Sequence, residues 1–359
     1  MKRSLILIVI VIVFAICSCN NSLCYKYEVR DICIDSIHSS VLEGNPVDFY
    51  MEGVRHIYSV DSFIVVHREY DNYYYNVYST NLDSIISFGT KGRSRNEFLS
   101  RPINSTKQIY NRDGDAIMPV MDNGICKEIN ITETIKKGST IVDGSFQSIP
   151  DDVASAVKIG KNNEQLIYSY AREDDMYRNR IILPKLYYID EKGKDKEYKV
   201  FERGLKCPNP NQMPVFYYRG VLRKQPEGNI VAMPMGYMNY IILFNTRKCQ
   251  QSALHIYGTG TFEDGIPDVD PANTLRCFGD DAIILPDKLI VQYFGDYYKM
   301  IEQDPDYCGR LLAFNWDGEL LNSYILHNYI NEFAYFRDKK ILYGANTFAE
   351  KIYTFYFDE

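Results

Sequence analysis

The residues that could carry out chemistry are scattered along the chain, and none of them forms a known catalytic motif. A catalytic metal needs three or four converging ligands, but the histidines include no His-x-His or His-x-x-x-His pair; they are His38, His56, His67, His255 and His327. Nucleophile-elbow, Walker, dinucleotide-binding and zinc-protease patterns are also missing from the sequence. The sequence therefore assigns no catalytic residue, no metal ligand and no cofactor, although distant segments could still bring such groups together.

Acidic residues are the next candidates for acid–base chemistry. Carboxylates that could lie at the mouth of a channel are Asp151-Asp152, Asp264 and Asp280-Asp281. Because charged side chains in loops are usually solvated, we interpret these acids as surface residues.

Two arginines are candidates for binding an anion. Arg93 and Arg95 lie in a glycine-bearing loop, just after Lys91. A phosphate cradle also needs a helix N-terminus after the glycines, and residues 96–99, close to Pro102, predict no helix. We therefore favour a connecting turn with solvated cations over an anion site.

Clustered tyrosines are candidates for a stacking platform. Tyr73-Tyr74-Tyr75 and Tyr217-Tyr218 could present rings to a glycan or a peptide, because tyrosine combines apolar area with a polar tip. The chain contains 31 tyrosines, and the alternative that these rings pack between sheets is favoured.

The first segment is a targeting signal. Lys2 and Arg3 precede the apolar run Leu5–Ile16, which would be about 18 Å long as a helix and too short to span a bilayer. Residues 1–18 are therefore interpreted as a signal peptide. The stretch Ile16-Cys17-Ser18-Cys19 resembles a bacterial lipobox, which implies cleavage after Ser18 and a lipid on the Cys19 sulfur. The alternative is an ordinary signal peptide with incidental cysteines.

Residues 19–24 are predicted to be the lipidated cysteine and a short tether. No acidic run follows Cys19, and such a run resembles the surface-export signal of some Gram-negative lipoproteins. Its absence favours an outer-membrane protein that faces the periplasm.

Seven cysteines are left after cleavage and lipidation, from an original nine at positions 17, 19, 24, 33, 126, 207, 249, 277 and 308. None of the seven has the C-x-x-C spacing of zinc or thioredoxin-type sites. Buried free thiols are the favoured interpretation, although an oxidising compartment would allow a bridge from Cys24 or Cys33.

Internal repeats indicate how the chain is organised. Six copies of a β-rich run followed by a turn occur at a mean spacing of 55 residues, beginning at Val77, Cys126, Leu186, Ile241, Leu311 and Ile352. A second hairpin precedes each copy, at Ile57–Val66, Ile109–Val120, Ala156–Tyr170, Val221–Met233, Ile283–Phe294 and Phe333–Tyr343. Two hairpins make four strands, and six such units match propeller blades. We predict an all-β, six-bladed β-propeller over residues 25–359.

The ends of the chain predict how the ring closes. The sixth unit stops at Glu359 before its outermost strand, while the strand-like segment 25–34 precedes the first unit without a partner. Pairing an N-terminal strand, placed at 25–34, with the last blade would leave no sheet incomplete.

A family resemblance agrees with this architecture. The loop Phe88–Phe98, leading to Pro102, resembles the Gly-x-x-Gly…Glu-Phe…Pro loop of NHL-type propellers and is especially similar to that of TolB-like six-bladed propeller lipoproteins of the Bacteroidota. Ser94 and Arg95 stand where Gly and Pro are common in that loop. The resemblance implies the fold and a cell-envelope location, and it implies no assigned reaction.

Composition limits the possible functions. The net charge of -7 gives no attraction to nucleic acid. The sequence favours a non-catalytic binding or scaffold propeller that presents loops and a central funnel to a protein or glycan partner. The alternative is a periplasmic hydrolase or lyase with its site at the mouth of the central channel.

Overall fold

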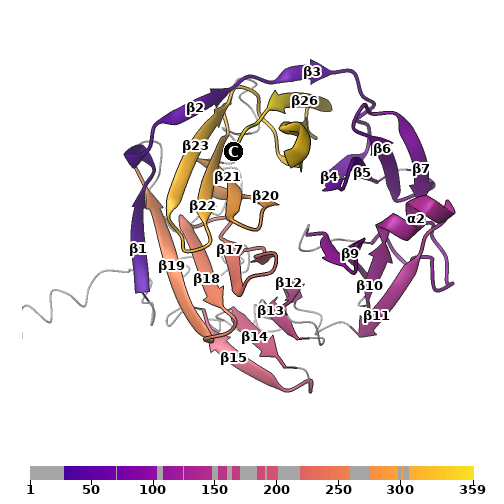
Figure 1. Ribbon diagram of the computed structural model, residues 1–359, viewed down its shortest axis with the longest axis horizontal. Helices are drawn as coiled ribbons and strands as arrows, with labels where there is room; N and C mark the ends of the chain where they lie inside the picture. The colour runs from indigo at the N-terminus through magenta and orange to yellow at the C-terminus, as the bar shows by residue number, and fades with distance from the viewer. Residues whose placement is uncertain are drawn as a thin grey trace, which may run out of the picture.

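The computed structural model describes residues 28–69, 71–102, 108–123, 125–147, 153–159, 164–169, 184–190, 192–200, 219–258, 275–297, 301 and 307–359. Within these ranges six small sheets form a ring (Figure 1). The protein is an all-β, six-bladed β-propeller, as predicted. The cysteine proposed to carry the lipid, Cys19, lies outside the described residues.

Each of the first five blades contains four antiparallel strands that follow one another in sequence from the inside outwards. The first blade contains β4 (Val54–Val60), β5 (Phe63–Arg68), β6 (Tyr75–Ser79) and β7 (Ser84–Phe88). The second contains β8 (Tyr110–Arg112), β9 (Asp115–Asp122), β10 (Ile125–Asn130) and β11 (Val142–Gln147), and the third contains β12 (Val153–Lys158), β13 (Gln165–Ser169), β14 (Lys185–Ile189) and β15 (Asp195–Lys199).

The remaining blades follow the same order. The fourth contains β16 (Arg223–Lys224), β17 (Ile230–Pro234), β18 (Tyr240–Asn245) and β19 (Gln250–Tyr257), and the fifth contains β20 (Leu275–Ile284), β21 (Lys288–Tyr297), β22 (Arg310–Asn315) and β23 (Leu320–Leu326). The sixth takes only β24 (Glu332–Phe336), β25 (Ile341–Asn346) and β26 (Lys351–Tyr356) from this end of the chain. Each predicted hairpin falls on these strands, except that a helix, α2 (Ile131–Lys137), follows β10 in place of a simple turn.

The N-terminal segment closes the ring, but with a different strand from the one predicted. The fourth strand of the last blade is β3 (Asn45–Val47), which pairs antiparallel with β26. The assignment of 25–34 to that blade is wrong, because β1 (Glu28–Cys33) pairs in parallel with β19 of the fourth blade. A count of four strands per blade left no place for a fifth strand there.

The segment 28–47 therefore spans three blades. Between β1 and β3, β2 (Ser39–Leu42) pairs in parallel with β23 of the fifth blade. Figure 1 shows β1, β2 and β3 following one another along the outer rim, beside β19, β23 and β26. We call this segment the belt.

Apolar side chains fill the spaces between neighbouring blades. One cluster joins the sixth blade to the first, with Ala334, Phe336 and Ile352 packed against Ile57 and Ile64. Similar clusters lie between the first and second blades, between the third and fourth, between the fourth and fifth, and between the fifth and sixth. Strands covered on both faces read as continuous apolar runs, which explains sequences such as 63–66 and 230–233.

The two faces of the ring differ in their connections. Short turns between first and second strands, such as Asp61-Ser62 and Asp113-Gly114, emerge on one face with the turns between third and fourth strands. The left-handed conformations of Asp61 (φ 48°) and Gly114 (φ 94°) are those that tight hairpins need. We call this face the turn face. The strands joined by the other connections, including those on either side of 89–109, 200–222 and 258–274, have the joined ends on the opposite face, which we call the loop face.

Candidate functional site

Aromatic side chains gather on the loop face of the fifth and sixth blades. Phe348, in the connection between β25 and β26, is 56% exposed. Its ring is stacked on that of Tyr329, with centroids 6.4 Å apart and planes at 18°. The centroid of the Tyr329 ring lies 6.0 Å from the ring centroids of both Phe294 and Tyr307 of the fifth blade. These contacts support the exposed Phe348 ring from beneath.

Tyr50 extends this arrangement to the connection between the sixth and first blades. It is 67% exposed, and the guanidinium of Arg68 lies 5.1 Å from the centre of its ring. Arg68 also donates hydrogen bonds to the carbonyls of Tyr50 and Glu52, at 2.6 and 2.7 Å. The buried Arg68 therefore fixes both the ring and the main chain beneath it.

The hydroxyl of Tyr50 donates a hydrogen bond to the carboxylate of Glu52. This bond is the main cause of the raised pKa of Tyr50, and the charge of Glu350 contributes to it. Phe348 and Glu350 belong to the connection between β25 and β26, and Tyr50 belongs to the connection between β3 and β4, so the two exposed rings lie on the same face of the ring. We call Phe294, Tyr307, Tyr329, Phe348 and Tyr50 the aromatic band.

A second group of polar residues lies on the inner strands of the ring. His56 of β4 and Glu332 of β24 approach each other, with Nδ1 and a carboxylate oxygen 3.1 Å apart. The ring of His67 is stacked between His56 and Tyr75, at centroid distances of 5.6 and 5.0 Å. This group joins the first blade to the sixth.

His67 is buried without hydrogen bonds to its ring nitrogens among the described residues. It is 3% exposed, and its pKa is lowered to about 3, first by burial and then by the neighbouring His56. The imidazole is therefore neutral at physiological pH. The hydroxyl of Tyr58 on β4 likewise has no partner among the described residues.

Polar and charged side chains form hydrogen bonds between the inner strands of other blades. Arg223 of β16 is fully buried and donates to the main-chain carbonyl of Asp280 in β20. The interpretation of the acidic candidates as surface residues is wrong for Asp281, which is buried and accepts a hydrogen bond from the Phe333 N–H of the sixth blade, at 2.8 Å. Asp280 is half-buried, and residues 151, 152 and 264 lie outside the described residues. Gln108, just before β8, exchanges hydrogen bonds of 2.9 and 3.0 Å with the main chain of Lys224 in the fourth blade. These contacts bind the inner strands together.

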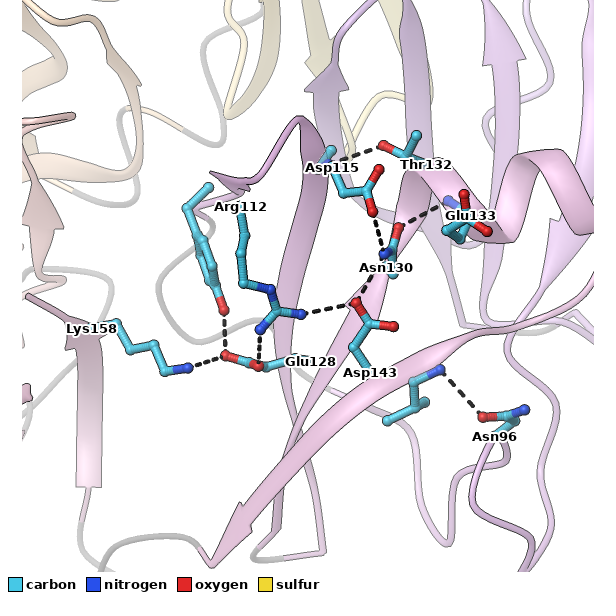
Figure 2. Close-up of polar contacts among 12 residues, drawn as sticks. Asn96, Arg112, Asp115, Glu128, Asn130, Thr132, Glu133, Asp143 and Lys158 are labelled. Carbon is cyan, nitrogen blue, oxygen red and sulfur yellow. Dashed lines mark hydrogen bonds and ion pairs between the residues drawn. The ribbon is translucent and has the colours of Figure 1, made fainter. Parts of the chain in front are cut away.

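Figure 2 shows a third polar group, which joins the second blade to the third. The buried carboxylate of Glu128 accepts hydrogen bonds from Tyr110, from Arg112 at 2.7 Å and from Lys158 of β12 at 2.6 Å. These partners lower the pKa of Glu128 against the opposing effect of burial. Arg112 also bonds Asp143 at 2.9 Å, so the network holds the outer strand β11 as well.

The predicted arginine candidates lie in a structural loop. Arg93 is exposed, and Arg95 donates to the carbonyl of Asp143 at 3.0 Å. Within the same loop Glu97 accepts a hydrogen bond from the Ser94 N–H at 2.9 Å, and Phe98 is fully buried. The loop thus connects the first blade to the second, which agrees with the interpretation as a turn.

The tyrosine candidates separate in the structure. Tyr73 is 41% exposed, Tyr74 is half-buried and Tyr75 is completely buried against His67 and Phe88. The three rings therefore form no common surface platform. Residues 217 and 218 lie outside the described residues.

Sequence reasoning missed the aromatic band. Four of its members lie in four separate connections, and the fifth, Phe294, lies on β21. No local spacing in the sequence therefore predicts that these rings gather on one face. The one indirect signal was the abundance of tyrosine.

The described residues hold no metal-ligand cluster and no helix that is long and apolar enough to cross a membrane. The five cysteines in these ranges are Cys33, Cys126, Cys249, Cys277 and Cys308, and Cys33, Cys126 and Cys249 among them are free thiols. Only Cys126 and Cys277 among them are buried.

No protein-family model and no curated protein matches this chain. Solved structures share its fold at low identity. A member of the DUF4221 family from Bacteroides vulgatus ATCC 8482 has a TM-score of 0.52 at 10% identity, over 89% of this chain and 96% of that one. A protein from Bacteroides fragilis NCTC 9343, described only provisionally as exported, has a TM-score of 0.50 at 11% identity, over 92% and 99%.

A third structure is an auxiliary nutrient binding protein from Bacteroides thetaiotaomicron VPI-5482. It has a TM-score of 0.45 at 10% identity and covers 89% of this chain and 75% of its own. The first two likenesses establish the propeller fold. The finer resemblance to TolB-like and NHL-type propellers stays a prediction from the sequence.

Proposed function

We propose that this protein is a non-catalytic binding propeller of the cell envelope, anchored by a lipid on Cys19, that holds a protein partner on its loop face. The observation that carries the proposal is the aromatic band, in which Tyr50 and Phe348 are exposed but already fixed by their neighbours. Side chains that are ordered before binding lose little entropy when a partner arrives.

The chemistry around the band favours a protein as the partner. Tyrosine is enriched among the residues that dominate binding energy in protein interfaces, and the exposed Tyr50 ring is held in place by the buried Arg68. The longest connections between blades also leave from the loop face, where a fixed scaffold usually displays its binding residues. The proposed signal peptide at 1–18 supports export to the cell envelope, and the lack of an acidic run after Cys19 favours the periplasmic side of the outer membrane.

Photo-crosslinking in cells tests this function. A benzoyl-phenylalanine is placed at position 50, at position 348 or, as the control, at position 356. Tyr356 matches Tyr50 in exposure, at 67%, but lies at the turn-face end of β26. We expect irradiation to give the same protein adduct at positions 50 and 348 and none at 356.

Two outcomes would contradict the proposal. A protein adduct of equal yield at all three positions would mean that the band has no special role. No adduct at positions 50 and 348, together with retention of a polysaccharide that Tyr50→Ala abolishes, would identify the partner as a glycan.

One observation favours a second candidate, a periplasmic hydrolase or lyase with its site at the channel. The His56–Glu332 pair brings an imidazole Nδ1 to 3.1 Å from a carboxylate oxygen on the inner strands, and a base oriented by a carboxylate needs these two groups. The contact is an approach of the two groups and not a hydrogen bond. The pKa values of the carboxyl groups of Glu69, Glu97, Asp122, Glu128 and Glu133 are all lowered, so none of these five is a protonated general acid.

Complementation of a deletion strain separates the two candidates. If the protein is a binding propeller, the double variant Tyr50→Ala, Phe348→Ala loses the cellular function and His56→Asn keeps it. The reverse pattern would support the enzyme.

A further inference from the structure

The belt fixes the direction from which the chain reaches the ring. In the parallel pairing of β1 with β19, Glu28 lies beside Ser252 and Cys33 beside Tyr257. Because β19 begins after the turn-face connection 246–249, β1 runs from the turn face towards the loop face. Its start is therefore near the turn face of the fourth blade.

A contact with the neighbouring blade supports this placement. The Arg30 guanidinium donates a hydrogen bond to the carbonyl of Asp317. Asp317 belongs to the turn between β22 and β23, on the turn face of the fifth blade. The first residues of the belt are thus held at the turn-face edge of the fourth and fifth blades.

The reach of the tether limits how a lipid-anchored molecule can stand. Residues 20–27 separate Cys19 from Glu28, and eight extended residues span at most about 29 Å. The six residues of β1 alone rise about 20 Å towards the loop face. To bring the loop face to the bilayer, the tether would have to run back over this height, which would take about 20 Å of its maximum of about 29 Å. The turn face reaches the bilayer with chain to spare.

We infer that the lipid-anchored protein stands with the turn face of its fourth and fifth blades towards the bilayer and holds its loop face away from it. This inference rests on the lipid anchor of the proposed function. The occupant of the turn face is then the lipid surface. The aromatic band faces the aqueous compartment, so its partner must approach from that side and cannot be a group within the same bilayer.

Tryptophan fluorescence can measure this orientation. Trp316 is the only tryptophan and lies on the turn face of the fifth blade, where its Nε1 donates to the carbonyl of Leu285 at 2.9 Å. The full-length lipidated protein is incorporated into phosphatidylcholine vesicles with a dansyl-labelled headgroup in the outer leaflet. Energy transfer from Trp316 to dansyl reports how close the turn face lies to the lipid.

A matched pair of donors compares the two faces. In a Trp316→Phe background, Tyr356→Trp puts the donor on the turn face and Tyr50→Trp puts it on the loop face, and both native tyrosines are 67% exposed. We expect transfer from position 356 to exceed transfer from position 50 by at least about twofold, because a strand length of about 20 Å separates the faces. Each efficiency is normalised to the same variant without acceptor.

The outcomes distinguish the orientation from the anchor. Equal transfer from both positions, or stronger transfer from position 50, in protein that sediments with the vesicles would overturn the orientation alone. If wild-type protein does not sediment with vesicles and behaves like Cys19→Ser, the lipid anchor is refuted and the orientation with it. The native donor Trp316 gives an independent reading should Trp316→Phe impair folding.

Discussion

Arg223 in the fourth blade donates a hydrogen bond to the main-chain carbonyl of Asp280 in the fifth blade, from a side chain that is completely buried. Burial lowers the pKa of Arg223 to about 10, while the charges of Asp281 and Asp280 oppose this effect. The guanidinium is therefore a cation at neutral pH inside the ring. Its attraction to these acids connects blades that share no sheet.

Replacing Arg223 should destabilise the whole ring. Arg223→Met removes the hydrogen bond to the Asp280 carbonyl, and leaving a buried polar group without its partner costs about 1–3 kcal/mol of unfolding free energy. Urea denaturation monitored by circular dichroism measures the loss. Arg93→Ala, at an exposed loop position, should leave the midpoint unchanged. A similar midpoint for the two variants would contradict the structural role of Arg223.

His67 should make the stability of the fold depend on pH. Its pKa is about 3 in the folded state against an ordinary value of 6.5, so the unfolded chain binds the extra proton between these values. The unfolding free energy that depends on the neutral His67 is therefore fully present above pH 6.5. It is lost as the pH falls towards 3, because only the unfolded chain gains the proton in that range. We expect wild-type protein to lose about 2 kcal/mol between pH 7 and pH 5 from this group.

The variant His67→Phe tests the source of that pH dependence. It keeps a flat ring between His56 and Tyr75 but removes the titrating group. Urea denaturation at pH 7 and pH 5 should show a smaller difference for the variant than for wild type. An unchanged difference would assign the pH dependence to other groups.

The network around Glu128 predicts a contrast between two glutamates. Glu128→Gln removes a buried charge from Tyr110, Arg112 and Lys158, and we expect it to lower the unfolding free energy by about 3 kcal/mol. Glu133 pairs with Lys136 and Lys137 at the surface, where ion pairs contribute little. Glu133→Gln should therefore have a much smaller effect in the same denaturation experiment.

Gly44 should be sensitive to the smallest side chain. A Cβ at this position would lie 2.7 Å from Phe355 and would collide with the Asn328 side chain, next to the strand that completes the last blade. We expect Gly44→Ala to cost about 1–3 kcal/mol through overpacking. Gly309→Ala is the control, because its Cβ would meet its nearest neighbours at 3.8 and 3.9 Å. Comparable thermal midpoints for the two variants would rule out tight packing at Gly44.

The blades could be predicted from the sequence because their signals are local. Alternating β-rich runs and turn residues marked the hairpins, and these lie where they were expected. The strand that closes the ring gave no such signal. It is three residues long and contains Pro46, which lacks an N–H group and is tolerated only at the edge of a sheet.

Helix α2 was missed although its ends are encoded in the sequence. Asn130 caps the helix by accepting a hydrogen bond from the Glu133 N–H at 2.9 Å, and Gly138 ends it in a left-handed conformation (φ 68°). These are ordinary start and stop signals, but the regular strand count favoured a turn.

The polar groups on the inner strands were beyond prediction for a different reason, since they meet only when the ring is complete.

The belt has a consequence for how the molecule is made. Its contacts join residues that are 287 and 309 positions apart, Arg30 with Asp317 and Asn45 with Thr354. Such long-range pairing slows folding, because the cost of closing the chain precedes any gain. The earliest part of the polypeptide can pair only when nearly the last residues are present, so the ring closes as a late step of folding and not blade by blade from the N-terminus.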